Sequence, residues 1–226
     1  MASSVIFENQ IAIPLDVGSL ARFRRWAASA AFPERGRIDF IEGDIEVELM
    51  VEDILCHGSP KIEVIRVLSQ LVKESADGVL FSDRARVSCP AADLSVEPDV
   101  VFVSDESLDA GRVRMVAKET GEPRRYVELE GAADLIVEIV SDSSEAKDTV
   151  RLPAAYWRAG VPEFSLIDSR GETLLFRVHH AGLESHEPAA PDADGFQRSS
   201  VFGDAFQLLR NVDRRGRWTF DLLVRG

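Results

Sequence analysis

The sequence has few of the features that mark common enzyme classes and secreted proteins. Its two cysteines, Cys56 and Cys89, lie far apart and outside any CxxC spacing, which argues against a disulfide framework and a zinc knuckle. It contains no GxSxG motif, no Walker loop and no dinucleotide-binding fingerprint. No apolar run approaches the about 18 residues of a membrane helix, and the start of the chain lacks an export signal. We expect a cytoplasmic protein that does not enter membranes.

Positive charge is also scarce. Lysine and arginine number 26 against 39 aspartates and glutamates, for a net charge of -13. Proteins that coat DNA without sequence preference need a broad basic surface, because neutralisation of phosphates drives their binding. The charge balance therefore argues against a protein of that kind. It leaves room for one cleft lined by arginines and for a divalent ion that offsets carboxylates locally.

Apolar residues make up 45% of the 226 residues, enough to bury a substantial core. We predict a single domain over residues 1–226, with its core at about 15–180 and a carboxy-terminal β extension. The spacing of apolar residues in the first half predicts, in order, a helix from Leu20 that ends before Pro33, strands near 37–42 and 45–50, a helix from Pro60 to about Gly78, and strands within 79–88.

The second half is predicted to alternate strands with one helix. A strand of about five residues begins at Asp99, and the run 135–140 is apolar enough for a central strand covered on both faces. Serines at 141–144 can cap a helix that stops at Gly160. The remaining predictions are a polar segment at 104–123 with a short strand near 113–116, strands at 163–168 and 173–180, a loop at 181–198, and short strands in 199–224. This mixture predicts the α/β (α+β mixed) class.

Glu138 is the most informative residue. It lies inside an otherwise apolar strand, where an unpaired ionised carboxylate would cost several kcal/mol. Something has to compensate for that charge. A bound cation, a salt bridge to a buried arginine, or a strand face open to solvent would each do so, and the sequence leaves all three open.

Asp99 supplies a second carboxylate at the mouth of another apolar strand, directly after Glu97 and Pro98. A Pro-Asp pair alone is common at turns and strand entries. Two carboxylates brought together by adjacent strands, however, form the hard oxygen site that Mg²⁺ prefers, where the ion also binds a phosphate. Asp99 and Glu138 are therefore candidate metal ligands.

Several segments in a fixed order carry a resemblance to a known family. They are Glu97–Val103, Ala133–Ser141, Lys147-Asp148 leading to Tyr156–Phe164, and Ile167-Asp168, joined in the first half by Arg37–Gly43 and His57. Over roughly residues 15–180 the chain resembles the Uma-two family of restriction endonucleases, in the PD-(D/E)XK nuclease superfamily. The resemblance implies a restriction-endonuclease-like fold, with a mixed central β-sheet flanked by helices.

The resemblance also implies hydrolysis of DNA phosphodiester bonds with Mg²⁺ or Mn²⁺. Asp99, Glu138 and the carbonyl of Ile139 would hold the ion, and Asp39 would position a second ion or a water. DNA is the expected substrate, and the side chains that would read its bases cannot be recognised. Strand edges of such folds often pair, which leaves a homodimer open.

The chain departs from the family pattern at its basic residue. The superfamily places a lysine two residues after the strand glutamate, where this chain has Val140, and the family's usual helix lysine falls on Leu152. The nearest basic residues, Lys147 and Arg151, lie four apart and would share one face of a continuous helix. We expect one of them to face the developing charge of the phosphate. Lys147 is slightly favoured, because Pro153 disturbs the geometry near Arg151.

Two functions therefore remain open. The first is a metal-dependent endonuclease. The alternative is a catalytically degenerate module that keeps the fold and binds or regulates without cleaving, which the valine at 140 and the acidic charge favour. His57, at the entrance of the predicted long helix, either orients a phosphate or water or packs there. Titration with metal discriminates between the two functions.

Overall fold

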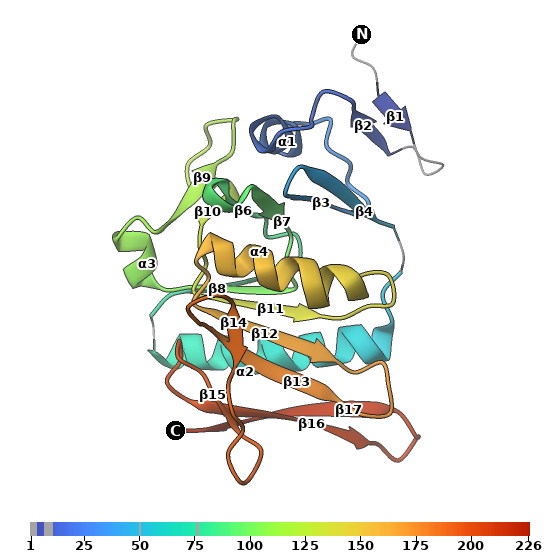
Figure 1. Cartoon of the computed structure of the whole chain (residues 1–226), viewed down its shortest axis with the longest axis vertical. Helices are drawn as coiled ribbons and strands as arrows, with labels where there is room; N and C mark the ends of the chain where they lie inside the picture. The colour runs from blue at the N-terminus through green and yellow to red at the C-terminus, as the bar shows by residue number, and fades with distance from the viewer. Residues whose placement is uncertain (1–3, 7–10, 50, 76) are drawn as a thin grey trace.

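The computed structural model describes residues 4–6, 11–49, 51–75 and 77–226 (Figure 1). Within these ranges the strands are β1 (Ser4–Ile6), β2 (Ala12–Pro14), β3 (Arg37–Ile41), β4 (Asp44–Glu48), β5 (Val79–Ser82), β6 (Val87–Cys89), β7 (Leu94–Val96), β8 (Val100–Val103), β9 (Val113–Ala117), β10 (Tyr126–Gly131), β11 (Leu135–Ile139), β12 (Glu163–Asp168), β13 (Leu175–Ala181), β14 (His186–Pro188), β15 (Gln197–Arg198), β16 (Ala205–Val212) and β17 (Trp218–Arg225). The α-helices are α1 (Leu20–Ala27), α2 (Ser59–Ser75), α3 (Asp105–Asp109) and α4 (Leu152–Ala159), with short π-helical or 3₁₀ turns η1 (Ile54–Gly58), η2 (Pro90–Ala92) and η3 (Lys147–Arg151).

The described strands form two six-stranded mixed sheets and two smaller antiparallel sheets. The amino-terminal sheet has the order β4-β3-β7-β6-β10-β9, and the central sheet has the order β14-β13-β12-β11-β8-β5. The carboxy-terminal sheet is β15-β16-β17, and β1 pairs with β2. Among the described pairs, β6 with β10 and β11 with β12 are parallel. This arrangement confirms the predicted class, mixed sheets flanked by helices.

The helices separate the sheets into layers. Helix α4 packs between the amino-terminal and central sheets, where Leu152, Ala155 and Tyr156 join one apolar cluster (Figure 1). Helix α2 and the carboxy-terminal sheet cover the opposite face of the central sheet, through Val64 and Leu68 among others. The central sheet is thus covered on both faces, which is why its strands are almost continuously apolar.

Strand β11 confirms the prediction of a buried central strand. All five of its residues are buried, and its side chains alternate between the two faces. Ile136 belongs to the α4 cluster, whereas Val137 and Ile139 belong to the α2 cluster. Glu138 has the parity of Ile136, so it faces α4.

The hairpin of β3 and β4 also confirms the sequence prediction. Its two turn residues, Glu42 and Gly43, have φ values of 52° and 88°, the left-handed conformations that a tight hairpin turn of this length requires. The hairpin matters because it carries Asp39 and Glu48 to Lys147 of η3, and Arg37 to Asp99.

Three sequence expectations are wrong in detail. The predicted loop at 181–198 contains the short strands β14 and β15. The predicted loop at 104–123 contains α3, a five-residue helix whose Ser104 cap accepts a hydrogen bond from the Ser107 backbone N–H; so short a helix leaves no apolar periodicity to read. The strands predicted as short in 199–224 are β16 and β17, eight residues each and paired along their full length.

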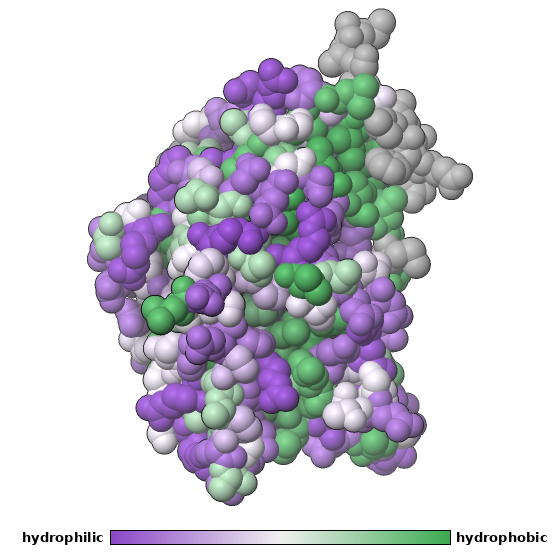
Figure 2. Space-filling model, viewed as in Figure 1, coloured by the Kyte–Doolittle hydropathy of each residue, from purple (hydrophilic) through white to green (hydrophobic). Residues whose placement is uncertain are grey.

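The surface reflects the composition. Hydrophilic side chains dominate the face shown in Figure 2, in keeping with the net charge of -13. No helix within the described ranges is long and apolar enough to cross a membrane. The single domain over 1–226 stays a prediction.

Candidate metal and catalytic site

Asp99 and Glu138 lie side by side because of the register between β8 and β11. Val100 faces Val137 across this antiparallel pair, so the next position in each direction sets Asp99 opposite Glu138. The backbone N–H of Asp99 donates to Glu138 Oε2 at 3.4 Å, and that of Ile139 donates to Asp99 Oδ2 at 2.8 Å. The two side chains are 0% and 1% exposed. The fold therefore brings together the two carboxylates that the sequence singled out.

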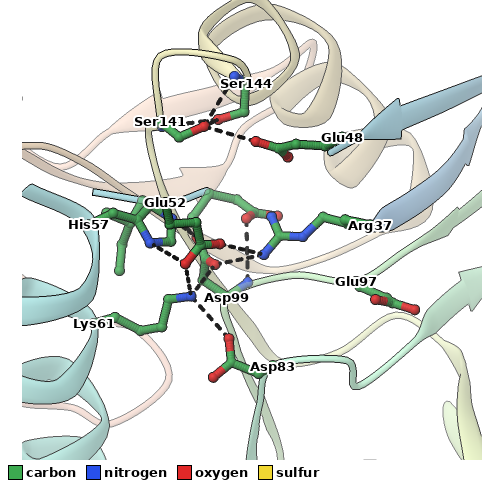
Figure 3. A network of polar contacts seen from close by, with 12 residues as sticks. Arg37, Glu48, Glu52, His57, Lys61, Asp83, Glu97, Asp99, Ser141 and Ser144 are labelled. Atoms are coloured by element: carbon green, nitrogen blue, oxygen red, sulfur yellow. Dashed lines mark hydrogen bonds and ion pairs between the residues drawn. The ribbon is translucent and has the colours of Figure 1, made fainter. Parts of the chain in front are cut away.

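Asp99 is surrounded by donors (Figure 3). Its Oδ1 lies 2.9 Å from Arg37 Nη2 and 3.0 Å from Lys61 Nζ, while Oδ2 lies 3.3 Å from His57 Nε2 and 2.8 Å from the Ile139 amide. A carboxylate offers about four lone-pair sites, so all of them are in use. Burial raises the pKa of Asp99, but the pairing with His57, Arg37 and Lys61 outweighs it and holds the pKa well below its usual range.

A second set of carboxylates surrounds these donors. Glu52 Oε2 lies 2.9 Å from His57 Nδ1 and 3.2 Å from Lys61 Nζ, and Asp83 Oδ1 lies 3.0 Å from Lys61 Nζ. The ion pair with His57 lowers the pKa of Glu52 to about 2. Burial lowers the pKa of His57, but Asp99 and Glu52 outweigh burial and raise it to about 9. His57 is therefore an imidazolium at neutral pH.

The Glu138 side is different, because it lacks cationic partners. The Tyr156 hydroxyl donates to Glu138 Oε1, and Oε2 receives only the long contact from the Asp99 amide. No salt bridge to Glu138 forms within the described part of the chain. Burial, together with the charges of Asp99 and Asp148, raises the pKa of Glu138 well above its usual range.

Asp148 adds another poorly compensated carboxylate. It is buried, the Ser144 hydroxyl donates to its Oδ2, and its Oδ1 has no hydrogen-bond partner among the described residues. Burial raises the pKa of Asp148 to about 7, against the lowering effects of Lys147 and Ser144. Asp148 belongs to one of the segments that carry the family resemblance, but no local pattern in the sequence predicts its burial.

Lys147 and Asp39 form a buried ion pair. Lys147 Nζ lies 3.1 Å from Asp39 Oδ2 and 3.4 Å from Glu48 Oε2, and Asp39 Oδ1 accepts from the Glu97 amide at 3.0 Å. Burial lowers the pKa of Lys147, but the charges of Asp39, Asp148 and Glu138 together outweigh burial, so the pKa is raised and the ammonium stays charged. Arg37, Asp39, Glu48 and Lys147 line a hollow of about 110 Å³.

Arg151 lies elsewhere. It donates to Glu46, to Asp44 Oδ2 at 3.2 Å and to the Ile41 carbonyl at 3.2 Å, so it fastens η3 to the β3–β4 hairpin. The structure does not bring it into contact with Asp99 or Glu138. The difference from Lys147 arises because residues 147–151 form a π-helical turn that continues into α4, with Pro153 at the first turn of that helix.

The positions where a lysine is usual hold apolar side chains deep in the core. Val140 and Leu152 are 0% and 1% exposed, and Leu152 belongs to the apolar cluster around α4. Neither position can present a charge to the site. Positive charge near the carboxylates therefore comes from other positions, namely Lys147, His57, Arg37 and Lys61.

Two larger hollows flank the carboxylates. One, of about 500 Å³, is lined by His57, Ser141, Ser143 and Arg170 among others. The other, of about 320 Å³, is lined by Arg37, Glu48, Glu52 and Asp83 among others. Asp99 and Glu138 line neither hollow, so an ion or a phosphate reaches them past His57 or Arg37.

The donor set fits a hard divalent cation on the Glu138 side. Glu138 and Asp148 are buried carboxylates without a direct cationic partner, and an oxygen of Asp148 has no partner among the described residues. A cation that also binds Asp99 must displace one of its four donors, and His57 makes the longest of those contacts. The carbonyl of Ile139 stays a predicted ligand. Ligand atoms of Glu52, His57 and Asp99 also lie within 4.8 Å of one another.

Sequence reasoning missed Arg37, Glu52, Lys61 and Tyr156 as members of the site. Lys61 stands in the first turn of an amphipathic helix, where an exposed lysine is common, and Arg37 begins an ordinary hairpin strand. His57 was identified but left between two roles. The structure places it against Asp99, held by η1, whose cap Asp53 accepts from the amides of Leu55 and Cys56.

Comparisons with known proteins agree with this architecture. The family model Uma2, described as "Putative restriction endonuclease", matches residues 20–209. Among solved structures, "a putative nuclease belonging to DUF820" from Anabaena variabilis ATCC 29413 is similar with a TM-score of 0.59 and 22% identity, covering 82% of this chain and 90% of that chain. A search of the curated proteins finds no match. At this identity the structural likeness shows the fold.

Proposed function

Because this chain belongs to the Uma2 family and has a restriction-endonuclease-like fold, we propose that it is a metal-dependent endonuclease that hydrolyses DNA phosphodiester bonds. One observation carries the proposal. Asp99, directly before β8, lies beside Glu138 in the neighbouring strand β11, both carboxyl groups are buried, and Glu138 forms no ion pair with any described residue. Mg²⁺ or Mn²⁺ is the cofactor that these oxygen ligands favour.

We assign the ion to Asp99, Glu138 and the carbonyl of Ile139, with Asp148 as a further carboxylate close to them. A bound divalent ion supplies Lewis-acid stabilisation of the scissile phosphate and makes a water more acidic. The protein's own part is to hold the ligands: the Ile139 amide and Arg37 orient Asp99, and the Tyr156 hydroxyl orients Glu138. Orientation by such contacts is what keeps metal ligands in place.

Lys147 is the basic residue that this proposal favours. Its ammonium is held by Asp39 and borders the hollow beside the carboxylate pair. A cation so placed stabilises the negative charge that develops on a phosphate during hydrolysis, and it does so best where water is excluded. Asp39 then acts as a positioning residue for Lys147. Arg151, fixed to the hairpin, takes no part in this proposal.

The test is hydrolysis of DNA by the purified chain. Supercoiled plasmid and single-stranded DNA are incubated with Mg²⁺, with Mn²⁺ and with EDTA, using wild type and Asp99→Asn. The proposal predicts cleavage by wild type that needs the metal and is lost in Asp99→Asn. Wild type that leaves every substrate intact with both ions would contradict it.

One observation favours the alternative, a module that keeps the fold without cleaving. The four donors around Asp99 already satisfy this carboxylate, so the site holds together without an ion. Such a module would bind DNA yet show no rise in melting temperature with Mn²⁺ and no cleavage. A cytoplasmic location and a homodimer stay predictions from the sequence.

A further inference from the structure

Lys61 occupies an unusual position for a lysine in a first helical turn. Its side chain is buried, and its ammonium lies 3.0 Å from Asp99 Oδ1, 3.0 Å from Asp83 Oδ1 and 3.2 Å from Glu52 Oε2 (Figure 3). The three oxygens come from three separate segments: the entrance of β8, the end of β5 and the approach to η1. A single positive charge is thus enclosed by three carboxylates.

The same cluster contains a histidine nitrogen that becomes a metal ligand when an incoming ion displaces its proton. His57 is 2% exposed, and its Nδ1 lies 2.9 Å from the Glu52 oxygen that Lys61 also contacts, but this nitrogen makes no directed hydrogen bond to a described residue. Ligand atoms of Glu52, His57 and Asp99 come within 4.8 Å of one another. Carboxylate oxygens with an imidazole nitrogen form a ligand set suited to Mn²⁺.

We propose that Lys61 is a built-in cation occupying a second metal position beside Asp99. The wild-type chain then takes one divalent ion, on the Glu138 side, and loss of the Lys61 charge opens a second site formed by Glu52, His57, Asp83 and Asp99. The first ion in this statement rests on the proposed function. The second position rests on the contacts of Lys61 and on the closeness of Glu52, His57 and Asp99, independently of the first ion.

The ammonium and a metal ion exclude each other at this position. Mg²⁺ binds oxygen at about 2.0 to 2.1 Å, closer than the ammonium contacts, so the same carboxylates would close around an ion only after Lys61 has left. Lys61 is tethered to α2 and therefore needs no diffusion from solution to fill the position. Without Lys61, Asp99 keeps only Arg37 and His57 as charged partners, and Glu52 and Asp83 lose a buried cation.

An ion has a route to this position. Glu52 and Asp83 line the hollow of about 320 Å³ together with Arg37, and the Asp83 side chain is 59% exposed. Glu52 and Asp83 are therefore accessible to a hydrated ion through this hollow.

The experiment counts Mn²⁺ bound per full-length chain, by calorimetric titration and by the electron paramagnetic resonance signal of free Mn²⁺. Wild type is compared with Lys61→Met, which removes the charge at similar volume, and with Lys61→Arg, which retains it. Expected values are one ion for wild type and for Lys61→Arg, and two for Lys61→Met. Adding Glu52→Gln to Lys61→Met should return the count to one. Lys61→Gln, which can still hydrogen-bond to the carboxylates, provides a second neutral variant if Lys61→Met does not fold.

The outcomes separate this inference from the proposed function. If neutral variants bind no more ions than wild type, or if wild type already binds two, the inference is wrong, whatever the DNA assay shows. If wild type binds none but Lys61→Met binds one that requires Glu52, the inference stands and the proposed metal site on the Glu138 side is wrong. If no form binds Mn²⁺, both are wrong.

Discussion

The two carboxylates of the site lie next to each other but in opposite electrostatic surroundings. Asp99 forms ion pairs with Arg37, Lys61 and His57 and accepts a hydrogen bond from a backbone amide. These contacts hold its pKa well below the usual range. Glu138 accepts a hydrogen bond from the Tyr156 hydroxyl and a long one from the Asp99 amide. Its pKa is raised well above the usual range. The protein thus supplies the counter-charge for one carboxylate and leaves the other for a ligand.

This asymmetry indicates where an ion adds most. A divalent ion gains most at a buried carboxyl group that has no ion pair, because its charge favours the ionised form there and it displaces no cationic side chain. On the Asp99 side an ion must first displace a donor. We therefore expect ion binding to depend most steeply on Glu138.

The largest expected effect comes from Glu138→Gln, which replaces the carboxyl group by an amide of similar shape that cannot ionise. We expect the Mn²⁺-dependent rise in melting temperature to disappear and DNA cleavage to fall by roughly 10³-fold or more, the scale for loss of a main electrostatic stabiliser. Without metal the variant should melt above wild type at neutral pH, because the raised pKa of Glu138 makes this carboxyl group destabilise the fold there. Exposed Glu184→Gln is the matched control and should behave as wild type. Metal-dependent cleavage by Glu138→Gln at the wild-type rate would contradict the claim that ion binding depends most on Glu138.

The next effect concerns the two basic residues of η3. Lys147→Met should reduce cleavage by roughly 10²-fold with little change in metal affinity, because the charge acts on the phosphate. Arg151→Met is its control on the same turn, since Arg151 contacts only the hairpin. Cleavage rates at saturating Mn²⁺, with melting curves for both variants, make the measurement. Equal losses of cleavage rate in the two variants would contradict the role proposed for Lys147.

Asp148→Asn tests whether the buried carboxyl group of Asp148 lacks a compensating charge. The pKa of Asp148 is raised from 3.8 to about 7 in the folded chain, so the protonated carboxyl stabilises the fold below pH 4 and that stabilisation is lost as pH rises through 7. At about 1.4 kcal/mol per pH unit, the loss amounts to a few kcal/mol. In EDTA, denaturant unfolding of wild type should show a decline between pH 4 and pH 7 that the variant lacks. Parallel curves for the two proteins would contradict this assignment.

His57→Gln tests the Asp99 side in a different pH window and should give the smallest effect. The pKa of His57 is raised from 6.5 to about 9, so its ion pairs stabilise the fold fully below pH 6.5 and are lost as pH rises through 9. The stability difference between wild type and variant should shrink over that window. A difference that stays constant from pH 6 to pH 10 would show that His57 is not held as an imidazolium.

The sequence was sufficient to find the carboxylates, because their signal is local. Glu138 interrupts an apolar strand, and Asp99 opens another, so each could be recognised from its neighbours in the chain. Strand alternation then put both on one face. The hairpin, the central strand and the helix ending at Gly160 were predicted for the same reason, since turn residues and apolar spacing specify them.

The charged partners could not be predicted, because they are distant in sequence. Lys147 meets Asp39 across 108 positions, and Arg37 meets Asp99 across 62. Nothing near Lys61 distinguishes it from a solvated lysine on a helix. Its carboxylate partners, Glu52, Asp83 and Asp99, come from three separate segments, which only the three-dimensional structure brings together.

The account's central claim is that the carboxylate pair is a metal-dependent site for DNA hydrolysis. The rate of supercoiled-plasmid nicking, measured against Mn²⁺ concentration for wild type and Glu138→Gln, tests that claim most directly. We predict a rate that rises and saturates with Mn²⁺ for wild type and stays at the EDTA background for Glu138→Gln. Equal rates for the two proteins, or no nicking by wild type at any Mn²⁺ concentration, would contradict the claim.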